Sequence, residues 1–169
     1  YWFCVKVLNW NDISNGIIDP NNLRYISKEQ HQSLKKGHLK EDDILISTRA
    51  NIGDIALISK QFEDANINAQ LVFVRTTNPK IYSKFLYIMF SSKEYKKIFE
   101  NFSSGSAQAQ LPMHALKRID ILWPENKIIE KFSYSINPVF EKIQSNNFQI
   151  QTLSKTRDAL LPKLMSGEI

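Results

Sequence analysis

The strongest constraint on the fold is a heptad pattern of apolar residues in the last quarter of the sequence. When Ile136 is taken as position a, the a and d positions run to Leu164, and seven of these nine positions are apolar. An apolar stripe this narrow packs against a partner helix rather than against a globular core. The pattern therefore predicts a long C-terminal coiled-coil helix. Its expected pairing residues are Ile143, Ile150, Leu153, Leu160 and Leu164.

A proline interrupts this helical pattern near its start. Proline has no backbone N–H and clashes with the preceding turn, so Pro138 predicts a break between a short helix at 125–136 and a longer one that runs from Pro138 to Met165. At a rise of about 1.5 Å per residue the longer helix would measure about 40 Å, close to one turn of B-DNA. This region is expected to act as a spacer or dimerisation element.

The rest of the chain alternates short β-type runs with helical patterns. Apolar and β-branched runs predict strands at 1–8, 44–48, 55–58, 71–74 and 119–123. We expect the three middle runs to pair in one small sheet. Ser27 and Gly37 are expected to open and close a short helix, and Pro79 precedes an apolar helical face. The sequence predicts an α+β fold, with a small mixed β-sheet and flanking helices at 1–124 and a helical region at 125–169.

Positive charge is concentrated in one segment of the chain. The net charge is +5, and between Arg75 and Arg118 eight basic residues stand against two acidic ones. Such a segment can provide an electrostatic footprint for phosphate groups. A solvated, lysine-rich helix face would produce the same count, so the charge alone leaves both interpretations open.

Several enzyme classes lack their motifs in this sequence. It contains no Gly-x-Gly and no Pro-Pro pair, which excludes the AdoMet loop and catalytic turn of a DNA methyltransferase, and it contains no P-loop. Glu94 and Lys96 form one of two Glu-x-Lys pairs, but no pair of aspartates precedes them, which argues against a metal nuclease. His31, His38 and His114 are too dispersed in sequence to predict a zinc site or a base–nucleophile pair.

The composition is typical of a soluble chain from the cytoplasm. The single cysteine, Cys4, excludes an internal disulfide, which favours a reducing compartment, and no run of about 18 apolar residues could span a membrane. The chain begins at Tyr1 rather than at methionine, so we expect it to be a piece of a longer or trimmed polypeptide.

Several short segments of the sequence resemble those of one protein family. The string from Arg157 to Ile169, Arg-Asp-Ala-Leu-Leu-Pro-Lys-Leu-Met-Ser-Gly-Glu-Ile, resembles very closely the helix ending of type I restriction-modification specificity subunits. Three upstream strings resemble the target-recognition domain of that family, in the same order. They are Asp43-Ile-Leu-Ile-Ser-Thr-Arg49 with Ile52-Gly53, Gly105-Ser-Ala-Gln108 leading to Leu111, and Ile119-x-Ile-x-x-Pro124. The resemblance covers 39–169, and Asp42 and Ala50 depart from it where the family usually has glycine.

The resemblance implies a non-catalytic DNA-reading module that binds no cofactor itself. Members of the family carry two such halves with approximate twofold symmetry, and each half reads one part of a split double-stranded DNA site. This chain resembles one half, so it is either a fragment of a full subunit or a half-length subunit that dimerises through its C-terminal helix. The implied partners are modification subunits, which bring AdoMet and methylate adenine, and a restriction subunit, which brings ATP and Mg²⁺ chemistry.

Loop residues with suitable side chains are the expected DNA contacts. Arginine is the commonest bidentate reader of guanine, whereas asparagine and glutamine read adenine. The candidates for base contacts are Arg49, Asn51, Arg75, Asn78, Ser104, Ser106, Gln108 and Gln110. The candidates for phosphate contacts are Lys35, Lys36, Lys84, Lys93, Lys96 and Lys97. Each candidate has a plainer alternative, which is a structural contact or a solvated surface position.

Two other functions stay open at the level of the sequence. The chain could use its helix to bind methyltransferase subunits without reading DNA, as a protein-interaction or antirestriction module. It could also be a nuclease built around Glu94 and Lys96, which would require metal-dependent DNA cleavage. The loop arginine, asparagine and glutamine residues favour DNA reading, but the sequence does not reveal which DNA sequence is read.

Overall fold

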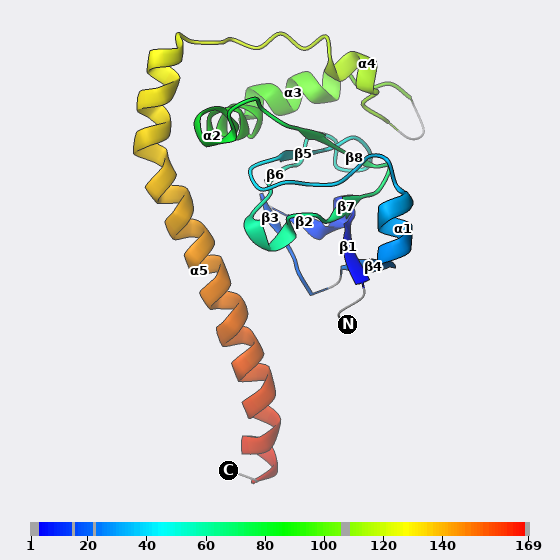
Figure 1. Cartoon of the computed structure of the whole chain (residues 1–169), viewed down its shortest axis with the longest axis vertical. Helices are drawn as coiled ribbons and strands as arrows, with labels where there is room; N and C mark the ends of the chain where they lie inside the picture. The colour runs from blue at the N-terminus through cyan, green and yellow to red at the C-terminus, as the bar shows by residue number, and fades with distance from the viewer. Residues whose placement is uncertain (1–3, 15, 22, 106–108, 168–169) are drawn as a thin grey trace. The chain divides into compact units, whose positions relative to one another are not determined.

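A computed structural model describes residues 4–14, 16–21, 23–105 and 109–167. The chain divides into two compact units, Tyr1–Ser133 and Tyr134–Ile169. The described part of the first unit contains small sheets with helices packed on them, and the second unit is the greater part of one long helix (Figure 1). The predicted α+β fold with a long C-terminal helix is therefore confirmed.

A three-stranded antiparallel sheet forms the centre of the first unit. Strand β5 (Ile44–Ser47) lies between β6 (Ile55–Leu57) and β8 (Leu71–Val74) and is antiparallel to both. All four residues of β5 are buried, as expected for a continuous apolar strand that is covered on both faces. These strands are the three runs that the sequence predicted as one sheet, and that prediction is confirmed.

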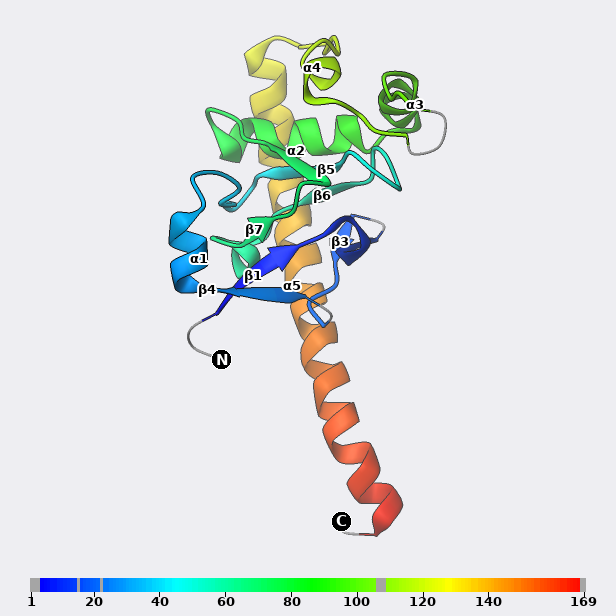
Figure 2. The same ribbon diagram turned by 90° about the vertical axis from the view of Figure 1, so that its right-hand side faces the viewer.

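The two faces of β5 contribute to different cores because side chains alternate along a strand. Ile44 and Ile46 pack in one hydrophobic cluster with residues of helices α2 (Pro79–Phe90) and α3 (Lys93–Asn101). Leu45 packs in the other cluster, with residues of the N-terminal strands. Figure 2 shows these layers, with β5 and β6 between α2 on one side and β1, β4 and β7 on the other.

The N-terminal sheet completes the layer opposite the helices. Strand β1 (Cys4–Leu8) pairs antiparallel with β4 (Arg24–Ser27) and parallel with β7 (Asn66–Ile67). The strand predicted at 1–8 is confirmed over Cys4–Leu8, and its first three residues lie outside the described part of the chain. Leu8 is fully buried and anchors this sheet to the central one.

A short hairpin occupies the segment in which the sequence shows turn signals. The 3₁₀ helix η1 (Trp10–Asp12) leads into β2 (Ile13–Ser14), which pairs antiparallel with β3 (Ile17–Ile18). Gly16 lies in the turn with a φ of 78°, a conformation that glycine adopts without steric cost. The turn therefore brings β2 and β3 back towards the central sheet, where Ile13 and Ile18 are buried.

Helix α1 (Lys28–Ser33) starts where the sequence predicts but ends earlier. Ser27 Oγ accepts a hydrogen bond from the Gln30 N–H at 3.2 Å, and Gln30 Oε1 accepts one from the Ser27 N–H at 3.3 Å, which is a capping box. The predicted end at Gly37 is wrong, because Leu34 already has an extended backbone. Two further short elements are the 3₁₀ helix η2 (Lys60–Phe62) and helix α4 (Met113–Leu116).

The strand predicted at 119–123 is not formed. Residues 119–124 have no regular secondary structure and pair with no strand of the described chain. Trp123 packs instead on the rings of Tyr82 and Phe85, with centroid distances of 5.2 and 5.8 Å. Trp123 thus packs on α2 rather than in a sheet.

The predicted break at Pro138 is also wrong, because one continuous helix, α5, spans Asn126–Ser166. A proline inside a helix removes one hydrogen bond and costs about 3 kcal/mol. The other turns of this 41-residue helix keep their hydrogen bonds around Pro138 and around Pro162, so the helix continues. The start of α5 belongs to the first unit, where Ile129 is fully buried and Ser133 Oγ donates a hydrogen bond to the Ile81 carbonyl.

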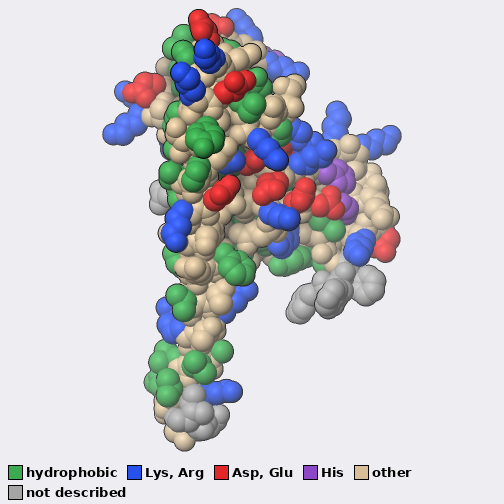
Figure 3. All heavy atoms as spheres, turned by 60° about the vertical axis from the view of Figure 1, so that its left-hand side comes forward, with side chains coloured by type: hydrophobic (Ala, Val, Ile, Leu, Met, Phe, Trp, Pro, Cys, Tyr) green, Lys and Arg blue, Asp and Glu red, His purple; other side chains and the backbone are tan. Residues whose placement is uncertain are grey.

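The second unit consists of α5 from Tyr134 onwards and exposes its apolar residues. The five predicted pairing residues are between 42% and 68% exposed in the single chain. They are Ile143, Ile150, Leu153, Leu160 and Leu164. Figure 3 shows hydrophobic side chains along this helix surface. Among the described residues, no helix combines the length and the hydropathy needed to cross a membrane.

Candidate nucleic-acid interface

Two segments that are far apart in sequence meet at Gln110. Isolated β-bridges join Gln110 to Arg49 and to Ser104. The Gln110 N–H donates to the Ser104 carbonyl and the Ser104 N–H donates to the Gln110 carbonyl, both at 2.9 Å. The Leu111 N–H donates to the Thr48 carbonyl at 2.9 Å, which holds the two segments in register. The fold therefore brings together three of the residues predicted as base contacts.

The side chain of Arg49 is held in place at this junction. Its Nη2 donates a hydrogen bond to Gln110 Oε1 at 3.0 Å. The remaining guanidinium donors form no hydrogen bond with the described residues, and Arg49 is exposed. When one guanidinium nitrogen of an arginine is held in place, the remaining N–H donors of this planar group can form two parallel hydrogen bonds with the edge of a base.

The turn that carries Arg49 has an unusual backbone. Ala50 has a φ of 58° and Gly53 a φ of 78°, and the Gly53 N–H donates to the Ser47 carbonyl at 2.9 Å. Asp42, which lies two residues before β5, has a φ of 65°. Both departures from the family pattern, Asp42 and Ala50, therefore occupy left-handed positions, where glycine avoids a steric cost.

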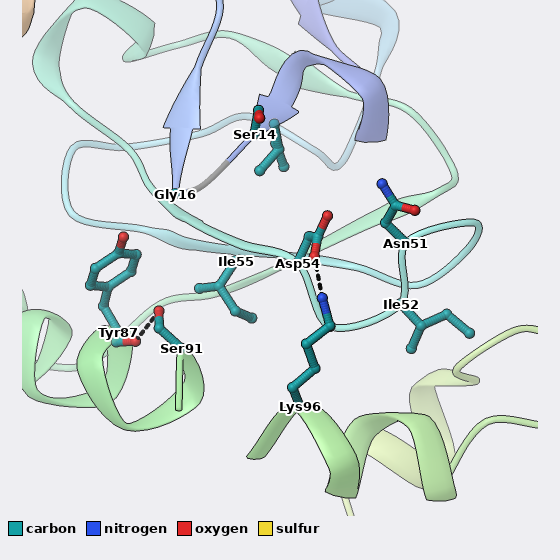
Figure 4. A pocket seen from close by; sticks show the side chains of 11 residues that line it. Ser14, Gly16, Asn51, Ile52, Asp54, Ile55, Tyr87, Ser91 and Lys96 are labelled. Atoms are coloured by element: carbon teal, nitrogen blue, oxygen red, sulfur yellow. Dashed lines mark hydrogen bonds and ion pairs between the residues drawn. The ribbon is translucent and has the colours of Figure 1, made fainter. Parts of the chain in front are cut away.

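Asn51 lies on the same turn and lines a hollow of about 700 Å³, shown in Figure 4. Lys96 of α3 reaches into this hollow, where its Nζ forms an ion pair with Asp54 Oδ1 at 2.8 Å. Tyr87 of α2 also lines it, and burial raises the pKa of its hydroxyl group, so this group stays a neutral hydrogen-bond donor. A base-contact candidate and a phosphate-contact candidate thus share one concave surface.

Arg75, another predicted base contact, is exposed, but its guanidinium is bound by neighbouring residues of the protein. Its Nε and Nη2 donate to the two carboxylate oxygens of Asp43 at 2.8 and 2.6 Å, and Nη2 also donates to the His38 carbonyl. The hydrogen bond to Asp43 raises the pKa of the guanidinium. The guanidinium also lies over the Phe73 ring. Base reading by Arg75 stays a prediction, but the contacts give this side chain a structural role.

The remaining candidates differ in how far they are available to DNA. Asn78 is exposed and occupies the N-cap position of α2 without a side-chain capping hydrogen bond, while Ser106 and Gln108 lie outside the described residues. Lys84 is only 12% exposed and pairs with Asp42 at 3.4 Å, which makes it a poor phosphate contact. The exposed lysines of the predicted set, apart from the ion-paired Lys96, are Lys35, Lys36, Lys93 and Lys97.

Two of the three histidines lie together, which corrects the expectation that the histidines are too dispersed to form a site. His31 and His38 lie against each other, with ring centroids 4.3 Å apart, and both contact Asp64. Sequence spacing missed this cluster because Asp64 follows η2, a separate element. His114 lies on α4 and is not part of the cluster.

Glu94, the carboxylate of the nuclease hypothesis, lies at the start of a helix and belongs to no cluster of potential metal ligands among the described residues. It lies in the first turn of α3, where hydrogen bonds from its own backbone N–H and from Ser92 lower its pKa. The helix N-terminus favours a negative charge at this position. Its neighbour Lys96 is paired with Asp54. These contacts give both side chains a structural explanation.

Comparisons with known proteins agree on one family. A sequence model described as the type I restriction modification DNA specificity domain matches residues 5–155. The HindI specificity subunit of Haemophilus influenzae is 28% identical over 135 residues, which cover 79% of this chain and 28% of that subunit. The EcoBI specificity subunit of Escherichia coli is 25% identical over 171 residues, which cover 98% of this chain and 35% of that subunit.

A solved structure shares the fold. The S subunit of a type I restriction-modification system from M. genitalium superposes with a TM-score of 0.55 at 19% identity, over 78% of this chain and 34% of that one. The chain thus spans about a third of the length of these relatives. Relatives that are named specificity subunits agree with the prediction that the chain has no catalysis of its own.

Proposed function

The chain belongs to the family of type I restriction modification DNA specificity domains, and on that premise we propose that its first unit reads one half of a split double-stranded DNA site. The observation that carries this proposal is the junction of Arg49, Ser104 and Gln110. Residues from two distant segments converge there, and all three were predicted as base contacts from their residue types. Loops that are held together by a rigid scaffold are where binding residues commonly lie.

Arg49 is proposed to read a guanine. Gln110 holds one guanidinium nitrogen at 3.0 Å, which limits the rotamers of the arginine before DNA arrives. Less conformational entropy is then lost on binding. A bidentate arginine–guanine contact contributes about 1–3 kcal/mol of discrimination against other bases.

Helix α3 is proposed to contact the phosphate backbone beside this junction. Helix α3 packs directly against the turn that carries Arg49, since a Cβ atom on Gly53 in that turn would come within 3.1 Å of the Phe99 ring. Lys93 and Lys97 are exposed on this helix. Their position next to the turn suits an orienting role, with base readers and phosphate contacts on adjoining surfaces.

The second unit is proposed to pair antiparallel with an equivalent helix, from another copy of this chain or from the other half of a longer subunit. Five exposed apolar residues on one helix have no core of their own to cover them. Antiparallel pairing would hold two reading domains apart and so set the spacing between two half-sites. Docking of modification and restriction subunits is part of the same proposal and rests on the family.

Methylome sequencing tests the proposal most directly. The gene is expressed in a host with its modification subunits, and the methylated motif is compared between wild type, Arg49→Ala and the control Arg24→Ala. Arg24 is an exposed arginine on β4, outside the junction. We expect a split motif that depends on the gene, that relaxes at one base pair in Arg49→Ala and that is unchanged in Arg24→Ala.

Two results would overturn the proposal. A motif that is identical with and without the gene, together with no binding of the purified chain to duplex DNA, would favour a protein-interaction module. Cleavage of DNA by the purified chain with a divalent metal would instead favour the nuclease hypothesis.

A further inference from the structure

His31, His38 and Asp64 bring two imidazole rings and one carboxylate to a single point on the surface. His31 Nε2 lies 3.2 Å from Asp64 Oδ2, and His38 Nδ1 lies 3.7 Å from Asp64 Oδ1. One ligand atom of each of these residues lies within 4.8 Å of the others. Figure 3 shows histidine side chains gathered beside acidic ones on this face. The cluster lies outside the junction proposed to read DNA.

Three separate segments hold these side chains in place. His31 belongs to α1, His38 follows Gly37, and Asp64 follows η2 with a φ of 62°. The two loop segments are joined by backbone hydrogen bonds, because the Asp64 N–H donates to the Leu39 carbonyl and the Leu39 N–H to the Ala65 carbonyl, both at 2.9 Å. The spacing of the ligand atoms is therefore set by the fold.

The distances suit an ion of the size of zinc. Ligand atoms that bind zinc at about 2.0–2.1 Å in tetrahedral geometry lie about 3.4 Å apart. The two measured separations, 3.2 and 3.7 Å, bracket that value. Two imidazoles and one carboxylate are also a donor set that borderline divalent ions prefer. A small rotation of the exposed Asp64 or half-buried His38 side chain would close the site around an ion.

Each histidine has a neighbour that can orient it for metal binding. His38 Nε2 lies 2.6 Å from the Leu34 carbonyl, so it carries the proton and leaves the Nδ1 lone pair facing Asp64. His31 Nδ1 lies 2.8 Å from the amide of Asn66, whose Oδ1 is buried without a partner among the described residues. If the oxygen and nitrogen of the Asn66 amide exchange places, Oδ1 accepts a hydrogen bond from the His31 Nδ1–H, and the lone pair of His31 Nε2 is available to a metal ion. The Asn66 amide nitrogen then loses its contact with His31.

We propose that His31, His38 and Asp64 bind one divalent transition-metal ion of the zinc class, with water completing the coordination. This site goes beyond the proposed function and does not depend on DNA reading. The ion would tie α1 and the segment after it to the loop that follows η2. Lys35 and Lys36 lie between the two histidines in sequence, so the ion would also fix the segment that carries these predicted phosphate contacts.

Titration of the untagged full chain with Zn²⁺ in a calorimeter tests the site. We expect one ion per chain, and visible absorption bands of a four-coordinate site when Co²⁺ replaces Zn²⁺. Asp64→Asn and His38→Gln should each weaken Zn²⁺ binding by at least about tenfold. Asparagine is chosen because it tolerates the left-handed backbone at this position. The matched control is His114→Gln, an exposed histidine outside the cluster, which should bind as the wild type does.

An NMR measurement on the wild type keeps the test independent of the folding of the variants. The ring nitrogen resonances of His31 and His38 should shift on addition of Zn²⁺, while those of His114 should not. The proposal is overturned if the wild type binds less than one ion, if either cluster variant binds as tightly as His114→Gln, or if all three histidines respond equally.

Discussion

Arg75 donates two parallel hydrogen bonds to the carboxylate of Asp43, from Nε at 2.8 Å and from Nη2 at 2.6 Å. Asp43 immediately precedes β5, and Arg75 immediately follows β8, so the pair joins the ends of two neighbouring strands. The Asp43 side chain is only 1% exposed. Loss of the arginine would leave a buried carboxylate without its counter-charge, which is strongly destabilising.

Arg75→Ala is therefore expected to lower the free energy of unfolding by about 2 kcal/mol. This is less than the loss for a fully buried ion pair, because solvent reaches the Arg75 side chain, which is 35% exposed. Arg75→Lys should recover only part of this loss, because lysine cannot form two parallel hydrogen bonds. Urea unfolding followed by circular dichroism measures both. The control is Arg118→Ala, at an exposed position, which should change stability by less than about 0.5 kcal/mol. Equal losses in Arg75→Ala and Arg118→Ala would contradict a structural role.

Arg49 and Gln110 are expected to act as a pair in sequence reading. Arg49→Ala should cost about 1–3 kcal/mol on the specific half-site and leave non-specific binding nearly intact. Gln110→Ala should cost less, because it removes only the contact that orients the arginine. Fluorescence anisotropy with the two single variants and the double variant gives the coupling energy. An equal loss of affinity for every DNA sequence would indicate that Arg49 contacts a phosphate group or supports the fold.

The lysines of α3 should determine the salt dependence of DNA binding. Each phosphate contact contributes about −0.9 to the slope of log K against log salt, so replacing Lys93 and Lys97 with glutamine should make the slope shallower by about 1.8. The control replaces Lys40 and Lys60, which are exposed and lie outside α3, and should leave the slope unchanged. A slope that is insensitive to Lys93 and Lys97 would remove α3 from the interface.

Ile150→Asp should disrupt pairing of the C-terminal helix. Ile150 is 60% exposed in the single chain and occupies an a position, where a charge facing the partner helix would be desolvated. Light scattering after size exclusion should report a dimer for the wild type and a monomer for the variant. Ser145→Asp, at an exposed position off the seam, should remain dimeric. A wild-type chain that is a stable monomer contradicts pairing between copies of this chain.

Ala50→Gly is expected to stabilise the protein. The left-handed conformation costs an alanine about 1–2 kcal/mol, and glycine loses about 0.5–1 kcal/mol more than alanine in backbone entropy, so the net gain is on the order of 0.75 kcal/mol. Ala69→Gly, at an exposed position without a positive φ, should have the opposite sign. Thermal unfolding of the two variants distinguishes these signs.

The elements that could be predicted from the sequence are those whose signal is local. The runs at 44–48, 55–58 and 71–74 are apolar enough to predict strands, and Ser27 with Gln30 forms the cap of α1. Neither prediction depends on distant residues, because the period of an apolar pattern and the hydrogen bonds of a helix cap both lie within one element. The heptad pattern likewise identified the long helix, although the cost of Pro138 was overestimated against the hydrogen bonds that the other turns keep.

Only the tertiary structure decided which candidate side chains are used internally and which residues meet. Arg75 finds Asp43 across 32 residues and Lys84 finds Asp42 across 42 residues, whereas Arg49 keeps exposed donors. These partners depend on strand register and helix packing, which residue type and spacing do not encode. The grouping of His31, His38 and Asp64 arises in the same way, because two backbone hydrogen bonds between separate loops bring the ligands together.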